Sequence, residues 1–122
     1  MSSYIKQLSV SKSLMKGENF PEMMKAIKAE ASKPEWNSYG TVKEVREAET
    51  FSHICKAMGI YLIYEGNDMF TVDVNGAYVS SFFIPMLLCV APFMNDGEIF
   101  VQIESHTVLI AFKDGEVYKS ER

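Results

Sequence analysis

The hydrophobic positions of the chain centre on one run, Phe82–Met94, whose thirteen residues include no charged side chain. A helix needs about 20 apolar residues to cross a bilayer, so this run is too short to span a membrane. We therefore expect a buried core helix. Leu88 and Cys89 lie in the middle of the run, and we predict that both are buried and that the Cys89 thiol is unreactive.

The ends of this apolar helix have their own signals. Ser80 or Ser81 can cap its first turn. Pro85 fits only within that first turn, where a missing N–H costs little. Pro92 is expected to end or kink the helix, because proline cannot continue the backbone hydrogen bonds.

Two further helices are predicted, over 20–31 and within 41–58. Their apolar residues recur every three or four positions, which places them on one helical face. Capping boxes precede both helices, at Asn19–Glu22 and at Thr41–Glu44. The segment Thr41–Arg46 also alternates, so a short strand is the alternative there.

Alternating apolar positions and turn residues predict two β-hairpins and two short terminal strands. These strands lie within 2–16, at Ile60–Tyr64 with Met69–Val74, at Glu98–Glu104 with Thr107–Phe112, and at Val117–Lys119. The order of elements indicates an α+β fold in a single domain, residues 1–122. In this fold an antiparallel sheet packs on two or three helices, one of them strongly apolar.

The loop 32–40 carries the only tryptophan, Trp36, with Tyr39 three residues later. A tryptophan in a loop either fills the edge of the core or serves as a binding anchor. We favour the first reading for Trp36, and include both aromatic residues among the candidates for protein binding.

The charge of the chain is unevenly placed. Residues 1–61 hold nine Lys and Arg against seven Glu, whereas residues 62–122 hold three against nine Asp and Glu. No Lys or Arg occurs between Lys56 and Lys113. The carboxylates in that interval are either a solvated face or a surface that binds a basic partner. They are Glu65, Asp68, Asp73, Asp96, Glu98 and Glu104.

No motif in the sequence carries a named chemistry, so we predict a protein that is not an enzyme and has no cofactor. Metal-ligand spacings and phosphate-binding glycine loops are absent. His53 and Cys55 are two residues apart, so they do not share a helix face. Glu104, Ser105 and His106 are adjacent at a hairpin tip, where side chains do not converge as a triad requires.

The basic residues are ten Lys and two Arg, and no stripe of basic and aromatic residues occurs. Nucleic-acid binding is therefore not expected. The N-terminus lacks the apolar core of a signal peptide, and the two cysteines are expected to be free. We predict a cytoplasmic protein with no membrane association.

The stretch Ala91–Val117 resembles the tail of small uncharacterised proteins of bacterial phages and mobile elements. It shares with them an Ala-Pro-aromatic helix end, an Asp-Gly turn and a hairpin that closes on Phe-Lys-Asp-Gly. The resemblance covers about a fifth of the chain. It implies a fold ending and a genomic neighbourhood, and no activity.

Size, charge and the lack of motifs favour a small binding protein that blocks a basic protein through an acidic C-terminal face. Immunity proteins of toxin systems and phage-encoded inhibitors of bacterial defence have these properties. The alternative is a small-molecule binding or sequestering protein, with its pocket between the sheet and the apolar helix and with Trp36 and Tyr39 at the mouth. An exposed terminal edge strand would also permit a homodimer.

Overall fold

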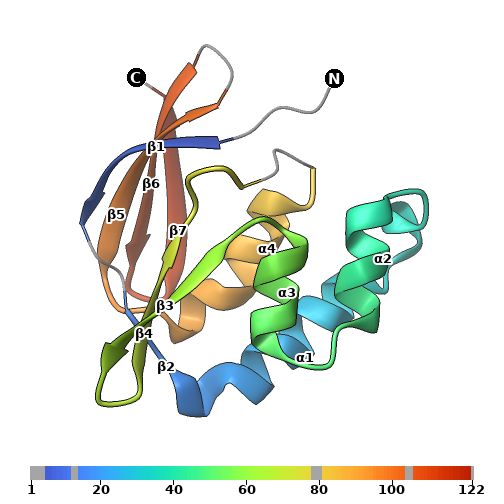
Figure 1. Cartoon of the computed structure of the whole chain (residues 1–122). Coiled ribbons are helices and arrows are strands. Elements are labelled where there is room, and N and C mark those ends of the chain that lie inside the picture. Colours follow the sequence, from blue (N-terminus) through green and yellow to red (C-terminus); the bar gives the residue numbers. More distant parts are fainter. Residues whose placement is uncertain (1–4, 12–13, 78–80, 104–105, 122) are drawn as a thin grey trace.

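The computed structural model of the chain describes residues 5–11, 14–77, 81–103 and 106–121. Four α-helices lie beside two antiparallel sheets, which confirms the predicted α+β class (Figure 1). We expected one sheet on two or three helices, so the sheet count and the helix count both differ from the prediction. The predicted strand Glu98–Glu104 lies in part outside the described residues, since Glu104 and Ser105 are among those not described.

The larger sheet has four strands in the order β1-β5-β6-β7, with every neighbouring pair antiparallel. Its strands are β1 (Ile5–Ser11), β5 (Gly97–Ile103), β6 (His106–Lys113) and β7 (Glu116–Glu121). The smaller sheet has three strands in the order β2-β4-β3. Its strands are β2 (Met15–Lys16), β4 (Met69–Asp73) and β3 (Tyr61–Gly66). Both predicted hairpins are therefore confirmed as elements.

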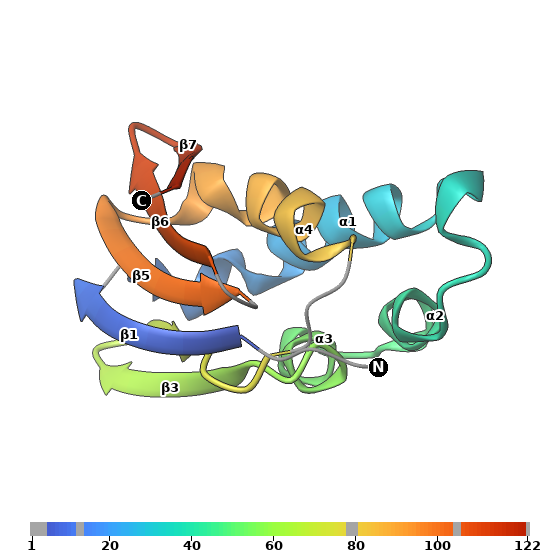
Figure 2. The ribbon, with the colours of Figure 1, turned by 90° about the horizontal axis from the view of Figure 1, so that it is seen from above.

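The N-terminal segment joins the two sheets, because β1 belongs to one and β2 to the other. At one end the Ile5 N–H donates to the Ala77 carbonyl (2.9 Å) and the Gly76 N–H donates to the Ile5 carbonyl (2.7 Å). At the other end the Asn95 N–H donates to the Leu14 carbonyl (2.9 Å). Figure 2 shows the strands gathered at one side of the molecule and the helices at the other. These backbone hydrogen bonds help to set the position of the small sheet relative to the large sheet.

The predicted helix within 41–58 is wrong as one helix. The structure has two, α2 (Gly40–Glu47) and α3 (Phe51–Ala57), separated where the backbone of Ala48 is extended. The Thr50 hydroxyl accepts a hydrogen bond from the His53 N–H (3.0 Å) and so caps α3. A capping residue takes an extended backbone, which interrupts the helical run. The alternative of a strand at Thr41–Arg46 is also excluded.

The predicted capping residues of the other helices do not cap. Helix α1 (Phe20–Ala31) confirms the predicted span, but a 3₁₀ turn at Gly17–Asn19 precedes it. Asn19 is therefore already in a helical conformation and makes no side-chain capping bond, because capping needs an extended backbone. Thr41 lies inside α2.

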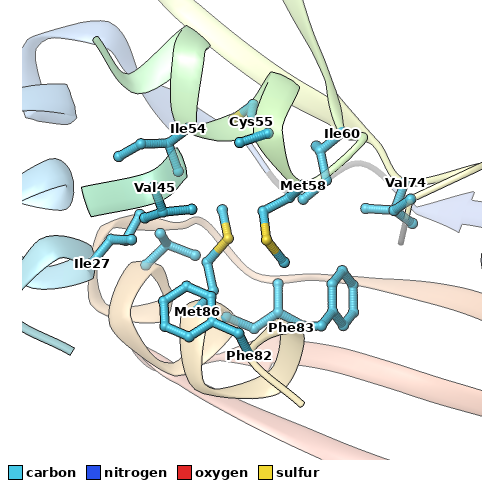
Figure 3. Packing of buried hydrophobic residues seen from close by; sticks show 14 of the residues in the cluster. Ile27, Val45, Ile54, Cys55, Met58, Ile60, Val74, Phe82, Phe83 and Met86 are labelled. Atoms are coloured by element: carbon cyan, nitrogen blue, oxygen red, sulfur yellow. The ribbon is translucent and has the colours of Figure 1, made fainter. Parts of the chain in front are cut away.

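The apolar run forms helix α4 (Phe83–Val90) followed by a 3₁₀ turn at Ala91–Phe93. Pro85 stands in the first turn, as expected. Phe82 precedes the helix without a side-chain cap, so Ser81 does not have the expected capping role, and Ser80 lies outside the described residues. In Figure 3, Phe82 and Met86 meet side chains of the other helices, with Ile27 and Val45 among them. The run is thus the centre of the core, as its composition predicts.

The prediction of a buried Leu88 is wrong, because Leu88 is 55% exposed. Helix α4 contacts the core along one side, where Met86, Leu87 and Val90 are buried. Leu88 instead lies beside Val117 at the surface. Cys89 is half-buried, so its predicted full burial is wrong as well. An entirely apolar sequence does not bury every face of a helix that has solvent on one side.

Candidate functional site

The hairpin of β3 and β4 is the most distinctive surface of the described structure. A two-residue turn closes it, with both Asn67 (φ 52°) and Asp68 (φ 59°) in the left-handed region. Asn and Asp tolerate this conformation, and turns of this kind match the twist of paired strands. Glu65 forms a bulge, since Tyr64 pairs with Phe70 and Gly66 pairs with Met69.

The turn is fastened to the 3₁₀ turn Gly17–Asn19, which precedes α1. The Gly17 N–H donates to the Asp68 carbonyl (2.8 Å), and the Glu18 N–H donates to Asp68 Oδ2 (3.0 Å). A Cβ atom at position 17 would lie 2.4 Å from Asp68 Oδ1, so a larger residue here would displace the Asp68 carboxylate from this position. The hairpin tip is therefore held in place rather than projecting without support.

Three large side chains of β3 are exposed: Tyr61 by 68%, Tyr64 by 63% and Ile63 by 39%. We call these three residues the hairpin patch. They are half of the six exposed large hydrophobic side chains in the described part of the chain. In both views the hairpin lies at the end of the molecule away from α2 (Figures 1 and 2). Clustered exposed aromatic residues are typical of interaction sites.

A row of aromatic rings connects the patch to the core. The Tyr64 ring lies 5.2 Å from the Phe70 ring, measured between centroids. Phe70 lies 4.9 Å from Phe20, which stacks on buried Phe51 at 4.5 Å. Such pairs prefer these separations. Tyr64 is thus exposed yet packs on a neighbouring ring, and this contact restricts the side chain and lowers the entropy lost when it binds a partner.

The charges on this hairpin are all negative. Glu65, Asp68 and Asp73 lie on it, and the strands carry no Lys or Arg. Two lysines lie at its margins. Lys16 belongs to β2 at the opposite edge of the sheet, where its Nζ is 4.0 Å from Glu18 Oε1. Lys56 lines a groove that reaches Tyr61.

The structure divides the predicted acidic residues between the two sheets. Glu65, Asp68 and Asp73 belong to the small sheet, while Glu98 is exposed on β5 of the large sheet. Glu104 lies outside the described residues. Asp73 and Asp96 accept hydrogen bonds from backbone N–H groups, of Asn75 (2.8 Å) and Asp114 (3.1 Å) respectively. These two aspartates, with Asp68, hold turns, which is where aspartate commonly serves the backbone.

Trp36 fills the edge of the core, and this confirms the reading that we favoured. It is only 7% exposed, and its ring meets Phe82 edge-on at 5.2 Å. Its Nε1–H donates to Glu30 Oε2 (2.9 Å). This bond, followed by one from Lys33, lowers the pKa of Glu30. Tyr39 remains 40% exposed beside Trp36.

A cavity does lie between the sheets and α4, where the small-molecule hypothesis places a pocket. The space open to the centre of a water-sized sphere is only about 30 Å³, and its lining is apolar throughout. Ligand pockets usually have about 300–1,000 Å³. Neither Trp36 nor Tyr39 lines it. The cavity is a packing defect of the core and offers no room for a metabolite.

The described residues bring together no set of groups with an evident chemistry. They contain no cluster of three or more His, Cys, Asp or Glu that could hold a metal ion. Both cysteines are free, and burial raises the pKa of Cys55 to about 12. His53 is exposed on α3 while Cys55 is buried, so these two side chains do not form a dyad.

Comparisons with known proteins identify no relative. No family model, no curated protein and no solved structure matches the chain. In the part of the chain that the structure describes, no helix has the length and apolarity needed to cross a membrane.

Sequence reasoning missed the hairpin patch, although a signal for it was present. Tyr61 and Ile63 alternate with Ile60 and Leu62, so this strand has bulky apolar residues on both faces. A strand with one buried face needs them on that face only. The large apolar side chains of Tyr61 and Ile63, on the face opposite Ile60 and Leu62, were therefore the signal in the sequence for a binding surface.

Proposed function

We propose that this chain is a small non-catalytic binding protein that blocks a basic protein partner through the hairpin patch and its neighbouring carboxylates. The observation that carries the proposal is the coincidence of three exposed large side chains with exclusively acidic charge on one hairpin. Aromatic anchors supply most of the binding energy at protein interfaces. Surrounding charge selects the partner and speeds its encounter.

Two features of the hairpin suit it to inhibition. It is fastened through Asp68 to the 3₁₀ turn that precedes α1, and its Tyr64 ring is supported by Phe70. A rigid surface of this kind binds without a large cost of ordering. Within this proposal we assign the protein to the immunity proteins of toxin systems or the phage-encoded inhibitors of bacterial defence, whose size and acidity it shares.

The test is affinity capture from a host lysate with mass spectrometry, using three forms of the chain. These are the wild type, the double variant Tyr61→Ala with Tyr64→Ala, and the control Tyr118→Ala. Tyr118 is a matched control, because it is 52% exposed but lies on β7 of the other sheet. Circular dichroism checks that each variant is folded.

We expect the wild type and the control to capture the same basic protein from the lysate, and the double variant to capture much less of it. Truncation of interface anchors typically costs about 2 kcal/mol or more, roughly thirtyfold in affinity. A partner captured equally by all three forms would place the binding surface elsewhere and refute the proposal.

A further inference from the structure

We propose that the partner binds by strand addition: an extended basic segment of its chain pairs with the outer edge of β3, along Tyr61–Tyr64, as a fourth strand of the small sheet. This inference rests on the proposed function and specifies its geometry. Strand β3 stands at the edge of the sheet, since the order is β2-β4-β3. An edge strand presents unpaired N–H and C=O groups to which another strand can bond.

The hairpin patch occupies both faces of β3, and this favours strand addition over docking on one face. Tyr64 pairs directly with Phe70 and shares its face. Tyr61 and Ile63 point to the opposite face, because successive side chains alternate. A ligand on one face would contact Tyr64 or the other two, but not all three. A strand that lies along the edge has side chains on both faces and contacts them all.

Strand β3 also has fewer of the charged residues that discourage pairing at β7, an edge strand of the large sheet. Strand β7 (Glu116–Glu121) is charged at both ends and contains Lys119. Charged residues, lysine above all, discourage pairing with foreign strands. Strand β3 begins with four uncharged residues that favour strands, Tyr61 to Tyr64, and its one charge is Glu65. Of these two edges, β3 is the one suited to accept a strand.

Charge selects a basic segment over a second copy of this chain. Pairing two copies through β3 would bring Glu65, Asp68 and Asp73 of both hairpins together. Neither strand of the hairpin carries a Lys or Arg, and each copy has a net charge of −4. Like charges across paired strands are unfavourable, whereas lysines on an added strand would meet these carboxylates.

The experiment uses the full chain labelled with ¹⁵N and a capped peptide probe of sequence Lys-Val-Lys-Val-Lys-Val-Lys. Amide hydrogen exchange is followed by NMR at positions 61–64, with and without the peptide. A second peptide has proline in place of the central valine, which keeps the charge but removes a backbone donor. A third has glutamate in place of every lysine.

We expect the basic peptide to slow exchange of the outward-facing amides at 61–64 by about tenfold or more. The proline peptide should bind about tenfold more weakly, because an added strand with proline loses a backbone hydrogen bond and fits the extended conformation less well. The acidic peptide should leave the exchange unchanged.

Strand addition is overturned if the basic peptide fails to bind, binds without protecting these amides, or binds no better than the proline peptide. Protection of the same amides that grows with protein concentration before peptide is added would instead identify a second copy as the occupant. The proposed function fails separately, when capture survives the loss of Tyr61 and Tyr64. Capture that needs these tyrosines without protection of β3 would refute strand addition alone.

Discussion

Leu87 and Leu88 are neighbours of the same type in one helix, yet the structure gives them opposite environments. Leu87 is 7% exposed and lines the core cavity, whereas Leu88 is 55% exposed. Substituting each with alanine therefore isolates burial, because helix, residue type and sequence neighbourhood are held constant. Alanine favours the helix slightly at both positions.

The expected losses follow from these exposures. Leu87→Ala removes a buried side chain and enlarges an existing cavity, so it should lower the free energy of unfolding by about 3 kcal/mol, within the usual range of roughly 2–5 kcal/mol. Full burial of a leucine contributes about 1.5–3 kcal/mol. Leu88 has somewhat less than half of its side chain covered, so Leu88→Ala should cost about 1 kcal/mol or less.

The assay is equilibrium unfolding in urea, followed by circular dichroism and by Trp36 fluorescence. Coincident transitions would establish that unfolding is two-state and that free energies can be compared. Losses of equal size for the two variants would refute the assigned orientation of α4. A loss for Leu88→Ala of about 3 kcal/mol would show that this side chain is covered in the folded protein.

Two further predictions concern the end of a helix and the thiols. Thr50→Ala should lower the free energy of unfolding by about 1 kcal/mol through loss of the α3 cap, while Thr41→Ala, inside α2, should cost clearly less; equal costs in urea unfolding would contradict the assigned cap. At pH 8 a thiol reagent should label Cys89 before Cys55, because burial raises the pKa of Cys55 to about 12 and leaves little thiolate. Burial raises the pKa of half-buried Cys89 too, so Cys89 should react more slowly than a free thiol; mass spectrometry that finds Cys55 labelled first would exclude its burial.

The elements that the sequence predicts correctly are those determined by residues within or next to the element itself. Alternation and turn residues predict both hairpins, and the uncharged run predicts the core helix. The break between α2 and α3 was missed because no glycine or proline marks it. Only the Thr50 cap interrupts the apolar periodicity there. The exposure of Leu88 depends on where the core ends beside α4, which a helix-length pattern does not contain.

The candidate site depends on contacts between residues that are far apart in the sequence. Tyr61, Ile63 and Tyr64 are exposed because β3 is an edge, and it is an edge because β2, more than forty residues earlier in the sequence, pairs with the other side of β4. The acidic interval was visible in the sequence, but its division between two sheets was not. Three of its aspartates also serve turns, which their turn-rich surroundings did suggest.

If a basic partner binds the acidic hairpin, its rate of association should depend on salt. Once a partner is captured, its association rate is measured at two salt concentrations for wild type, Glu65→Gln and Glu44→Gln. Glu44 is the control, since it is an exposed glutamate on α2, away from the hairpin. At physiological ionic strength, salt largely screens the interaction between exposed charges that are more than about 8 Å apart.

We expect the association rate of the wild type to fall as the salt concentration rises. Glu65→Gln should slow association at low salt by about two- to fivefold and flatten this dependence, while Glu44→Gln matches the wild type. Equal rates and equal salt dependence for all three forms would contradict a role for the hairpin charge in binding.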